Sequence, residues 1–325
     1  MGGLISIAPV VTRAAGASIS VPTAVATPAD DVSHPGLAGG NTTEWWYAEV
    51  SDPNSSQTFI LSLIQLPMPN VSDFWYDKYG NKSNTQNSLS SFTSSSTYPP
   101  NVQTSAGSLV YDTTAQAYHL VYNNTSDGKS ADIWFYGAHP GVTVGPDPVS
   151  GNQTMYWTNP VLTSSVSGWI KPGSFSQQIS VNGWRGYHDH NYGKFDLTNQ
   201  GWRGWEWGVS HNPGGGGFAM FSVINGDGTY AGETIHADST GTTFCNADYT
   251  ASNWTWNNGE WFPLQVVQNC PAAPSYHDTW TVTQPFVLNT FGIFLLDEGY
   301  GHSQVSGSVG LVEHGRTGTY NYLGS

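Results

Sequence analysis

Short runs of apolar and aromatic residues, many of them alternating with polar ones, recur along the chain from Thr43 onward. A period of two residues sends successive side chains to opposite faces of a strand, so each run predicts a β-strand. The predicted strands are residues 45–50, 58–66, 118–122, 133–136, 161–169, 175–181, 205–210, 218–223, 230–236, 279–283, 292–296 and 307–313. No apolar period of 3.6 residues persists without an interrupting Gly or Pro, so the predicted fold class is all-β.

Sequences that favour turns separate these runs. The Asn-Asn-Thr-Ser-Asp-Gly sequence at 123–128 predicts a turn, and the glycine-rich sequence at 213–217 predicts a hairpin. Residues 225–228 (Asn-Gly-Asp-Gly) predict another turn. Residues 81–106 are dominated by Ser, Thr and Asn, which indicates a long surface loop.

At 325 residues the chain is long enough for one large β domain or two smaller ones, and we favour two of similar size. Residues 1–30 are rich in Ala, Ser and Pro, and we interpret them as an unstructured leader or the remnant of a signal peptide. The first β domain is expected over residues 31–182 and the second over residues 183–325.

The charge balance excludes several classes of partner. The chain has 9 Lys and Arg against 23 Asp and Glu, for a formal net charge of −14. Binding of nucleic acid or of an anionic membrane surface needs clustered cations, so neither partner is expected. No apolar run reaches the roughly eighteen residues of a membrane span, so no transmembrane segment is predicted.

Two cysteines and several N-glycosylation sequons favour the secretory pathway. Cys245 and Cys270 are either joined by a disulfide, which would stabilise the fold by roughly 3 kcal/mol, or remain two buried thiols. Sequons occur at Asn41, Asn54, Asn70, Asn81, Asn123, Asn124, Asn152 and Asn253. We favour the disulfide and a location outside the cell or in the secretory-pathway lumen.

Only 10% of the residues are charged, yet His188-Asp189-His190 concentrates three ionisable groups. In a strand the two histidines point to one face, and Asp189 points to the other together with Asn191. The histidine spacing also occurs in metal sites, which need a third ligand. The candidates for that ligand are His211, Glu206, His236 and His314. Because the sequence selects none of them, we predict no metal.

A second cluster, Glu44-Trp45-Trp46-Tyr47, sets a carboxylate beside aromatic rings. Adjacent tryptophans on a strand face opposite sides, so one can line a cavity while the other packs outside it. Indole surface raises the pKa of a neighbouring carboxylate, which suits a general acid or a hydrogen-bond donor. The alternative is a core strand with an aromatic anchor.

Trp205-Glu206-Trp207 and Glu313-His314 combine similar groups nearer the C-terminus. For these the alternatives are a solvated or Arg-paired glutamate and a surface turn. Other enzyme signals are missing from the sequence: there is no Gly-x-Ser-x-Gly elbow, phosphate loop, dinucleotide fingerprint or His-Glu-x-x-His. Hydrolase, kinase and nicotinamide-dehydrogenase functions are therefore disfavoured.

In their order along the chain, these motifs resemble the AttH-like, carotenoid 1,2-hydratase (hydroxyneurosporene synthase) superfamily, which includes kievitone hydratase-type proteins and fungal Diels–Alderases. The motifs are residues 44–47, 188–193, 205–208 and 310–314, and the resemblance extends over residues 40–315. Tyr192 stands where many relatives carry Trp.

The resemblance implies two lipocalin-like β-barrel or sandwich domains packed side by side, with an aromatic pocket in and between them and no cofactor. We therefore expect a secreted (hetero-)Diels–Alderase of fungal secondary metabolism that joins a quinone-methide-like diene to a terpene alkene. The alternatives are a hydratase acting on a prenyl-type double bond and a non-catalytic carrier of an apolar ligand. The expected partners are apolar small molecules, and formation of a homodimer stays open.

A neutral cycloaddition needs oriented substrates and one or two hydrogen bonds to a carbonyl on the diene. We expect His188, Asp189 and His190 to supply donor or acid groups, with Glu44 and Glu313 as second candidates. The residues expected to bind substrate are Trp45, Trp46, Tyr47, Tyr187, Asn191, Tyr192, Trp205, Trp207 and His314.

Overall fold

The computed structural model describes residues 19–35, 42–55, 57–65, 68–150, 153–195, 202–212, 214–225, 229–257, 260–272, 277–291, 296–305 and 308–317. Apart from η1 (Pro28–Asp31), a short 3-10 helix, the regular structure of this part of the chain is β-strand, which confirms the all-β prediction. Within the described ranges, no helix has the length and apolar character needed to cross a membrane.

The first sheet is built from the N-terminal strands, each antiparallel to its neighbours. These are β1 (Thr23–Val25), β2 (Thr42–Ser51), β3 (Thr58–Gln65), β4 (Asn70–Tyr76), β5 (Lys82–Ser88), β6 (Phe92–Ser94), β7 (Asn101–Thr104), β8 (Gly107–Asp112), β9 (Ala117–Asn123), β10 (Lys129–His139), β11 (Val142–Ser150), β12 (Gln153–Pro172), β13 (Ile179–Ser180) and β14 (Arg185–Lys194). The order is β5-β4-β3-β2-β14-β12-β10-β9-β8-β7-β6, with β11 and β13 also paired to β12 and β1 paired to β11.

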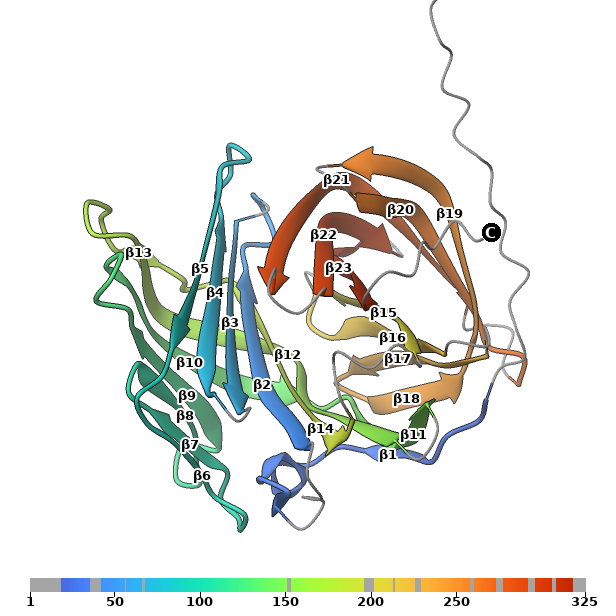
Figure 1. Cartoon of the computed structure of the whole chain (residues 1–325), viewed down its shortest axis with the longest axis horizontal. Helices are drawn as coiled ribbons and strands as arrows, with labels where there is room; N and C mark the ends of the chain where they lie inside the picture. The colour runs from blue at the N-terminus through green and yellow to red at the C-terminus, as the bar shows by residue number, and fades with distance from the viewer. Residues whose placement is uncertain are drawn as a thin grey trace, which may run out of the picture.

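The second sheet is an antiparallel set in the order β18-β17-β16-β15-β23-β22-β21-β20-β19. Its strands are β15 (Trp202–His211), β16 (Gly217–Asn225), β17 (Tyr230–Asp238), β18 (Gly241–Asn246), β19 (Asp248–Asn257), β20 (Glu260–Asn269), β21 (His277–Phe291), β22 (Leu296–Val305) and β23 (Ser308–Thr317). Figure 1 shows both sheets strongly curled and lying side by side. The arrangement confirms the prediction of two lipocalin-like β domains.

The period-two pattern explains most strands, and its exception locates the contact between the sheets. Along β10, buried residues alternate with partly exposed ones from Lys129 to Phe135, as expected for a strand with one buried face. In β14 every residue from Gly186 to Gly193 is buried. A strand without an exposed face must pack on both sides, and β14 does so because the second sheet covers its outer face.

Three apolar cores follow from this arrangement. One lies within each curled sheet. The third joins them, with Trp157 and Tyr187 from the first sheet packed among Trp205, Trp207 and Phe221 from the second. Burying a large apolar side chain stabilises the fold by roughly 1.5–3 kcal/mol, so this shared core holds the sheets together.

Two sequence expectations about local structure were wrong. Residues 81–106 are not a long loop, because they contain the edge strand β5 together with β6 and β7. The strand expected at 175–181 shortens to β13, and Phe175 at its start is fully exposed. The strand expected at 292–296 lies mostly outside the described residues.

The chain passes from the first sheet to the second at a later position than the expected boundary between residues 182 and 183. β14 is hydrogen-bonded between β2 and β12 in the first sheet, so the change of sheet falls between Lys194 and Trp202. The described end of the segment interpreted as a leader is also part of the fold. β1 pairs with β11, and the Ile19 N–H donates to the Tyr230 carbonyl in the second sheet.

The predicted disulfide joins Cys245 on β18 to Cys270 just after β20, with their Cα atoms 6.0 Å apart. The sequons differ in exposure. Asn54, Asn81, Asn123 and Asn253 are exposed, Asn70 and Asn124 are buried, and Asn41 and Asn152 lie outside the described residues. Glycosylation stays a prediction, and exposure favours the first four positions as acceptors.

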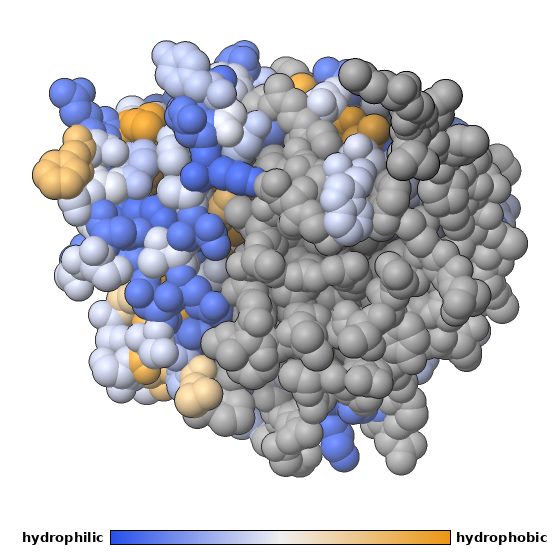
Figure 2. Space-filling model, turned by 45° about the horizontal axis from the view of Figure 1, so that its top comes forward, coloured by the Kyte–Doolittle hydropathy of each residue, from blue (hydrophilic) through white to orange (hydrophobic). Residues whose placement is uncertain are grey.

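The face of the first domain seen on the left of Figure 2 is mainly hydrophilic, with single apolar side chains scattered over it. Isolated surface hydrophobics are normal in folded proteins and do not form a binding patch.

Candidate active site

The two faces of β14 carry different chemistry. Because side chains alternate along a strand, Asp189 and Asn191 point to the face that meets the second sheet, and His188 and His190 point into the first domain. This is the division that the sequence predicted. β2 lies beside β14 with Asp189 opposite Tyr47, so its residues follow the same alternation.

A cavity of about 40 Å³ lies between the sheets on the Asp189 face. It is lined by Trp45, Tyr47, Met155, Trp157, Asp189, Asn191, Trp205, Trp207, Phe221 and Glu313. This volume holds a few water molecules, whereas drug-sized ligands occupy about 300–1,000 Å³. A larger substrate must therefore displace side chains of the wall, and Trp45 is one that is only partly buried.

The Asp189 carboxyl, which lines the cavity, accepts three hydrogen bonds. One carboxyl oxygen accepts from Tyr187 Oη at 2.5 Å and Trp157 Nε1 at 2.9 Å, and the other accepts from Asn191 Nδ2 at 2.9 Å. Trp207 Nε1 in turn donates to Tyr187 Oη at 2.9 Å. Burial raises the pKa of Asp189 to about 6, although the hydrogen bonds from Tyr187 and Trp157 oppose the rise.

A second carboxyl faces the same cavity from the other sheet. Glu313, on β23, accepts a hydrogen bond from Trp205 Nε1 at 2.6 Å. Trp205 and Trp207 lie on the same face of β15, so both indoles reach the cavity. Each sheet thus contributes one carboxyl to the cavity, and each carboxyl accepts a hydrogen bond from an aromatic side chain.

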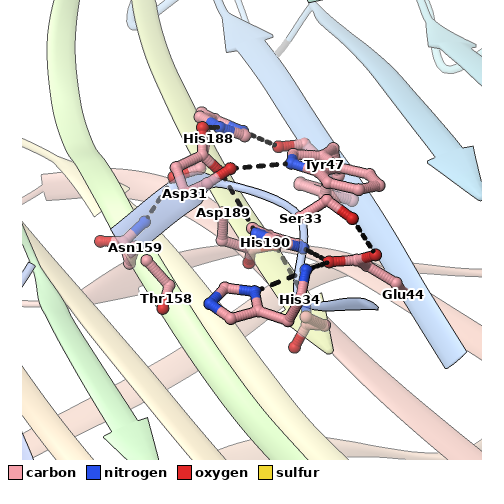
Figure 3. Close-up of polar contacts among 12 residues, drawn as sticks. Asp31, Ser33, His34, Glu44, Tyr47, Thr158, Asn159, His188, Asp189 and His190 are labelled. Atoms are coloured by element: carbon pink, nitrogen blue, oxygen red, sulfur yellow. Dashed lines mark hydrogen bonds and ion pairs between the residues drawn. The ribbon is translucent and has the colours of Figure 1, made fainter. Parts of the chain in front are cut away.

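The opposite face of β14 carries a buried network of imidazoles and carboxylates (Figure 3). His188 Nε2 lies 2.9 Å from Asp31 Oδ2, and its Nδ1 lies 2.7 Å from the Tyr47 carbonyl oxygen. His190 Nε2 lies 3.0 Å from Glu44 Oε1, and its Nδ1 lies 3.4 Å from Asp31 Oδ1.

Burial alone would raise the pKa of Asp31 and Glu44, but the facing imidazoles outweigh it and lower both to about 2. The raised pKa expected for Glu44 beside its tryptophans was therefore wrong, because the sequence did not show the imidazoles that face it. For His188 and His190 burial acts to lower the pKa, and the carboxylates reverse this so that both values are raised. Two carboxylates thus face two imidazoles, which lets the buried charges balance.

Several residues predicted for the site lie in this network or against it rather than at the cavity. His188, His190 and Glu44 belong to it, Trp46 stacks on His190 at 4.2 Å between ring centroids, and Tyr192 stacks on the ring of His34 at 3.6 Å. The side chain of His314 lies outside the described residues; its backbone pairs with Glu206 and Gly299.

The third metal ligands considered from the sequence have other partners where the structure describes them. His211 Nδ1 lies 2.9 Å from Thr163 Oγ1, and His236 Nε2 lies 2.7 Å from Asp278 Oδ2. Glu206 is fully buried on β15, whose backbone at this position pairs with β16 and β23.

The sequence analysis missed Asp31, Ser33 and His34, which reach the network from the N-terminal segment. Their signal was an acidic pair and a histidine in a chain with few charges, just before the Glu44 motif. All three residues lie just after the segment interpreted as a leader, where no strand and no motif was predicted. Trp157 and Phe221 of the cavity were also missed, because a single buried aromatic residue looks the same in any core.

No protein-family model and no curated protein match the chain. Solved structures do. An AttH-assigned protein from Nitrosomonas europaea shares 15% identity at a TM-score of 0.62, over 88% of this chain and 95% of its own. The chain has the AttH-like fold. Two further structures with this fold are CghA bound to Sch210972 and kievitone hydratase from Nectria haematococca.

CghA shares 9% identity at a TM-score of 0.63, over 86% of this chain and 90% of its own. Kievitone hydratase shares 11% at a TM-score of 0.58, over 94% and 98%. These matches confirm the AttH-like resemblance predicted from the motifs. At such identities they establish the fold, and the reaction must be argued from the site.

Proposed function

We propose that the chain is a cofactor-independent (hetero-)Diels–Alderase that joins a quinone-methide-like diene to a terpene alkene in the cavity between its two sheets. The observation that carries the proposal is the wall of this cavity. The wall is made mainly of aromatic rings, and its two carboxyls are held by hydrogen bonds from aromatic side chains. Trp207 donates to Tyr187, which donates to Asp189, and Trp205 donates to Glu313.

Such a wall suits a reaction between two neutral, unsaturated partners. A cycloaddition needs no nucleophile, and holding the partners in a reactive pose can lower the barrier by up to about 7–11 kcal/mol. Asn191 uses one amide hydrogen on Asp189, and its second can donate to a substrate carbonyl. A protonated Asp189 would assist loss of water from the precursor of the diene.

His188 and His190 then have a positioning role. Their rings lie on the opposite face of β14 and hold the strand to the N-terminal segment and to β2. Of the three residues first expected to donate to the substrate, Asp189 is the one with direct access to the cavity.

A hydratase is the second candidate, and one observation favours it. Asp189 and Glu313 line the same small cavity from opposite sheets, and the cavity is large enough to hold water. One carboxyl could protonate a prenyl-type double bond while the other accepts a proton from water, and the surrounding rings could stabilise the cation.

The decisive experiment is mass spectrometry of the purified chain incubated with a reactive diene precursor and humulene. We expect a stereodefined adduct of the summed mass less one water, lost with Asp189→Asn and retained with Asp132→Asn on the outer face of β10. An alkene that gains one water would replace the proposal by the hydratase. No product, with a ligand that co-purifies, would leave the non-catalytic carrier.

We also propose that the chain is secreted or lumenal. Its disulfide is of the kind that persists in oxidising compartments. Expression in a eukaryotic host would test this by the presence of the chain in the medium or in an endoglycosidase-sensitive form.

A further inference from the structure

Three ligand atoms converge in the network behind β14. His34, Glu44 and His190 each offer one ligand atom, and the three atoms lie within 4.8 Å of one another. We propose that these three side chains form a site for one divalent transition-metal ion of the zinc class, which ties the N-terminal segment to β2 and β14. The proposal is independent of the function proposed above.

The distances suit a tetrahedral ion. Zinc binds imidazole nitrogen and carboxylate oxygen at about 2.0–2.2 Å, so neighbouring ligand atoms lie about 3.3–3.6 Å apart. Glu44 Oε1 lies 3.6 Å from His34 Nδ1 and 3.0 Å from His190 Nε2. The third pair, the two nitrogens, can close by rotation of His34, whose side chain is 25% exposed, while that of His190 is fully buried.

The surroundings select His190 rather than His188 as the ligand. Both ring nitrogens of His188 are engaged, one by Asp31 and the other by the Tyr47 carbonyl. His190 instead presents Nε2 to Glu44 and turns Nδ1 towards Asp31 Oδ1 at 3.4 Å. A carboxylate behind a ligating imidazole fixes the ring and its tautomer, and is the usual outer-shell partner of metal-bound histidine.

The carboxylate is also held in place. Glu44 Oε2 accepts from Ser33 Oγ at 2.9 Å, which leaves Oε1 directed at the two imidazoles. The His34 backbone N–H donates to Oε1 at 2.9 Å, so the segment that supplies one ligand orients another. Figure 3 shows His34 and His190 on either side of the Glu44 carboxylate. The side chain of His34 is 25% exposed, so an ion and a water ligand could reach the three residues from its side.

The donor set determines the class of metal. Calcium and magnesium prefer sites made of oxygen atoms, whereas two imidazoles and one carboxylate suit zinc and its neighbours in the first transition series. Without a metal, a proton on His190 Nε2 fills the same gap to Glu44. The question for experiment is therefore whether a metal replaces that proton.

The test is zinc binding to the full chain after removal of metals with a chelator, followed by calorimetric titration and metal analysis. We expect one zinc per chain, and at least about tenfold weaker binding in His34→Gln, given that losing even an outer-shell partner costs 10–100-fold. His119→Gln is the matched control, because His119 also faces a carboxylate, Asp132, at 2.9 Å but on the outer face. It should bind zinc as the unaltered chain does.

Absence of binding to the unaltered chain, or equal loss in His34→Gln and His119→Gln, would overturn the proposal. The circular-dichroism spectrum of each variant establishes that it is folded. Cobalt gives a second readout that does not depend on any variant. Four-coordinate Co²⁺ in the unaltered chain should show intense visible absorption, and the weak spectrum of the six-coordinate aqueous ion would contradict the site.

Discussion

Asp147, on β11, is 1% exposed, and neither of its carboxyl oxygens has a hydrogen-bond partner among the described residues. Burial, with a smaller contribution from the charge of Glu233 on the facing sheet, raises the pKa of Asp147 from 3.8 to about 8. The unfolded chain ionises at this position near pH 4, so folding at neutral pH requires the uptake of a proton. Asp147→Asn should therefore stabilise the protein at neutral pH.

The magnitude follows from the two pKa values. At pH 7 protonating a carboxyl of pKa 3.8 costs 1.36 kcal/mol for each pH unit above that value, or about 4 kcal/mol. The cost falls below about 1 kcal/mol near pH 4. Because the folded pKa is raised, the contribution of this carboxyl to stability is fully present below the unfolded pKa and is lost as the pH rises towards about 8.

The assay is urea unfolding of the unaltered chain and of Asp147→Asn at pH 4 and pH 7, with the free energies compared at equal m-values. We expect a gain of up to about 4 kcal/mol at pH 7 and little change at pH 4. Asp132→Asn controls for replacement of a carboxyl by an amide on the surface. A gain that is the same at both pH values would refute the reasoning, because a neutral packing effect has no such pH dependence.

Three other variants test particular contacts. Tyr187→Phe removes the hydroxyl that bridges Trp207 and Asp189. It should lower the free energy of urea unfolding by about 1–3 kcal/mol and reduce turnover, and unchanged turnover would contradict the prediction. Lys129→Met leaves the buried carboxylate of Asp73 and the partly exposed one of Asp127 without their cation, and it should cost about 3–5 kcal/mol by the same assay; an unchanged free energy of unfolding would mean that water reaches Asp73. C245S/C270S should lower the free energy of unfolding by about 3 kcal/mol, and the unaltered chain in reductant is the control that should match it. Equal unfolding midpoints for the variant and the oxidised unaltered chain would contradict this.

The pattern of the sequence predicted strands well where they bury one face. In β10 the alternation in the sequence is also the alternation of burial, so the period alone was sufficient. It failed for β5, which is at the edge of the sheet and has mostly exposed side chains. The backbone hydrogen bonds to β4 hold β5 in place, and these leave no trace in the pattern of apolar residues.

The candidate site was predicted in part, and the limit has a physical cause. Spacing by two assigned His188 and His190 to one side of a strand and Asp189 to the other, since that geometry holds in any strand. It could not tell that both sides are buried, because the group that covers each side comes from far along the chain. Asp31 lies 157 residues before the histidine that it contacts.

The position of β14 between the two domains links the cavity to the imidazole network. β14 is a single strand that carries the cavity carboxyl on one face and the imidazole network on the other, so a shift of the strand must move both. An ion or a proton bound among His34, Glu44 and His190 would thereby fix the position of Asp189 without touching a substrate. On this argument His34→Gln should leave the hydrogen-bond partners of Asp189 in place but broaden the range of adducts formed, since positioning rather than proton transfer is what it weakens.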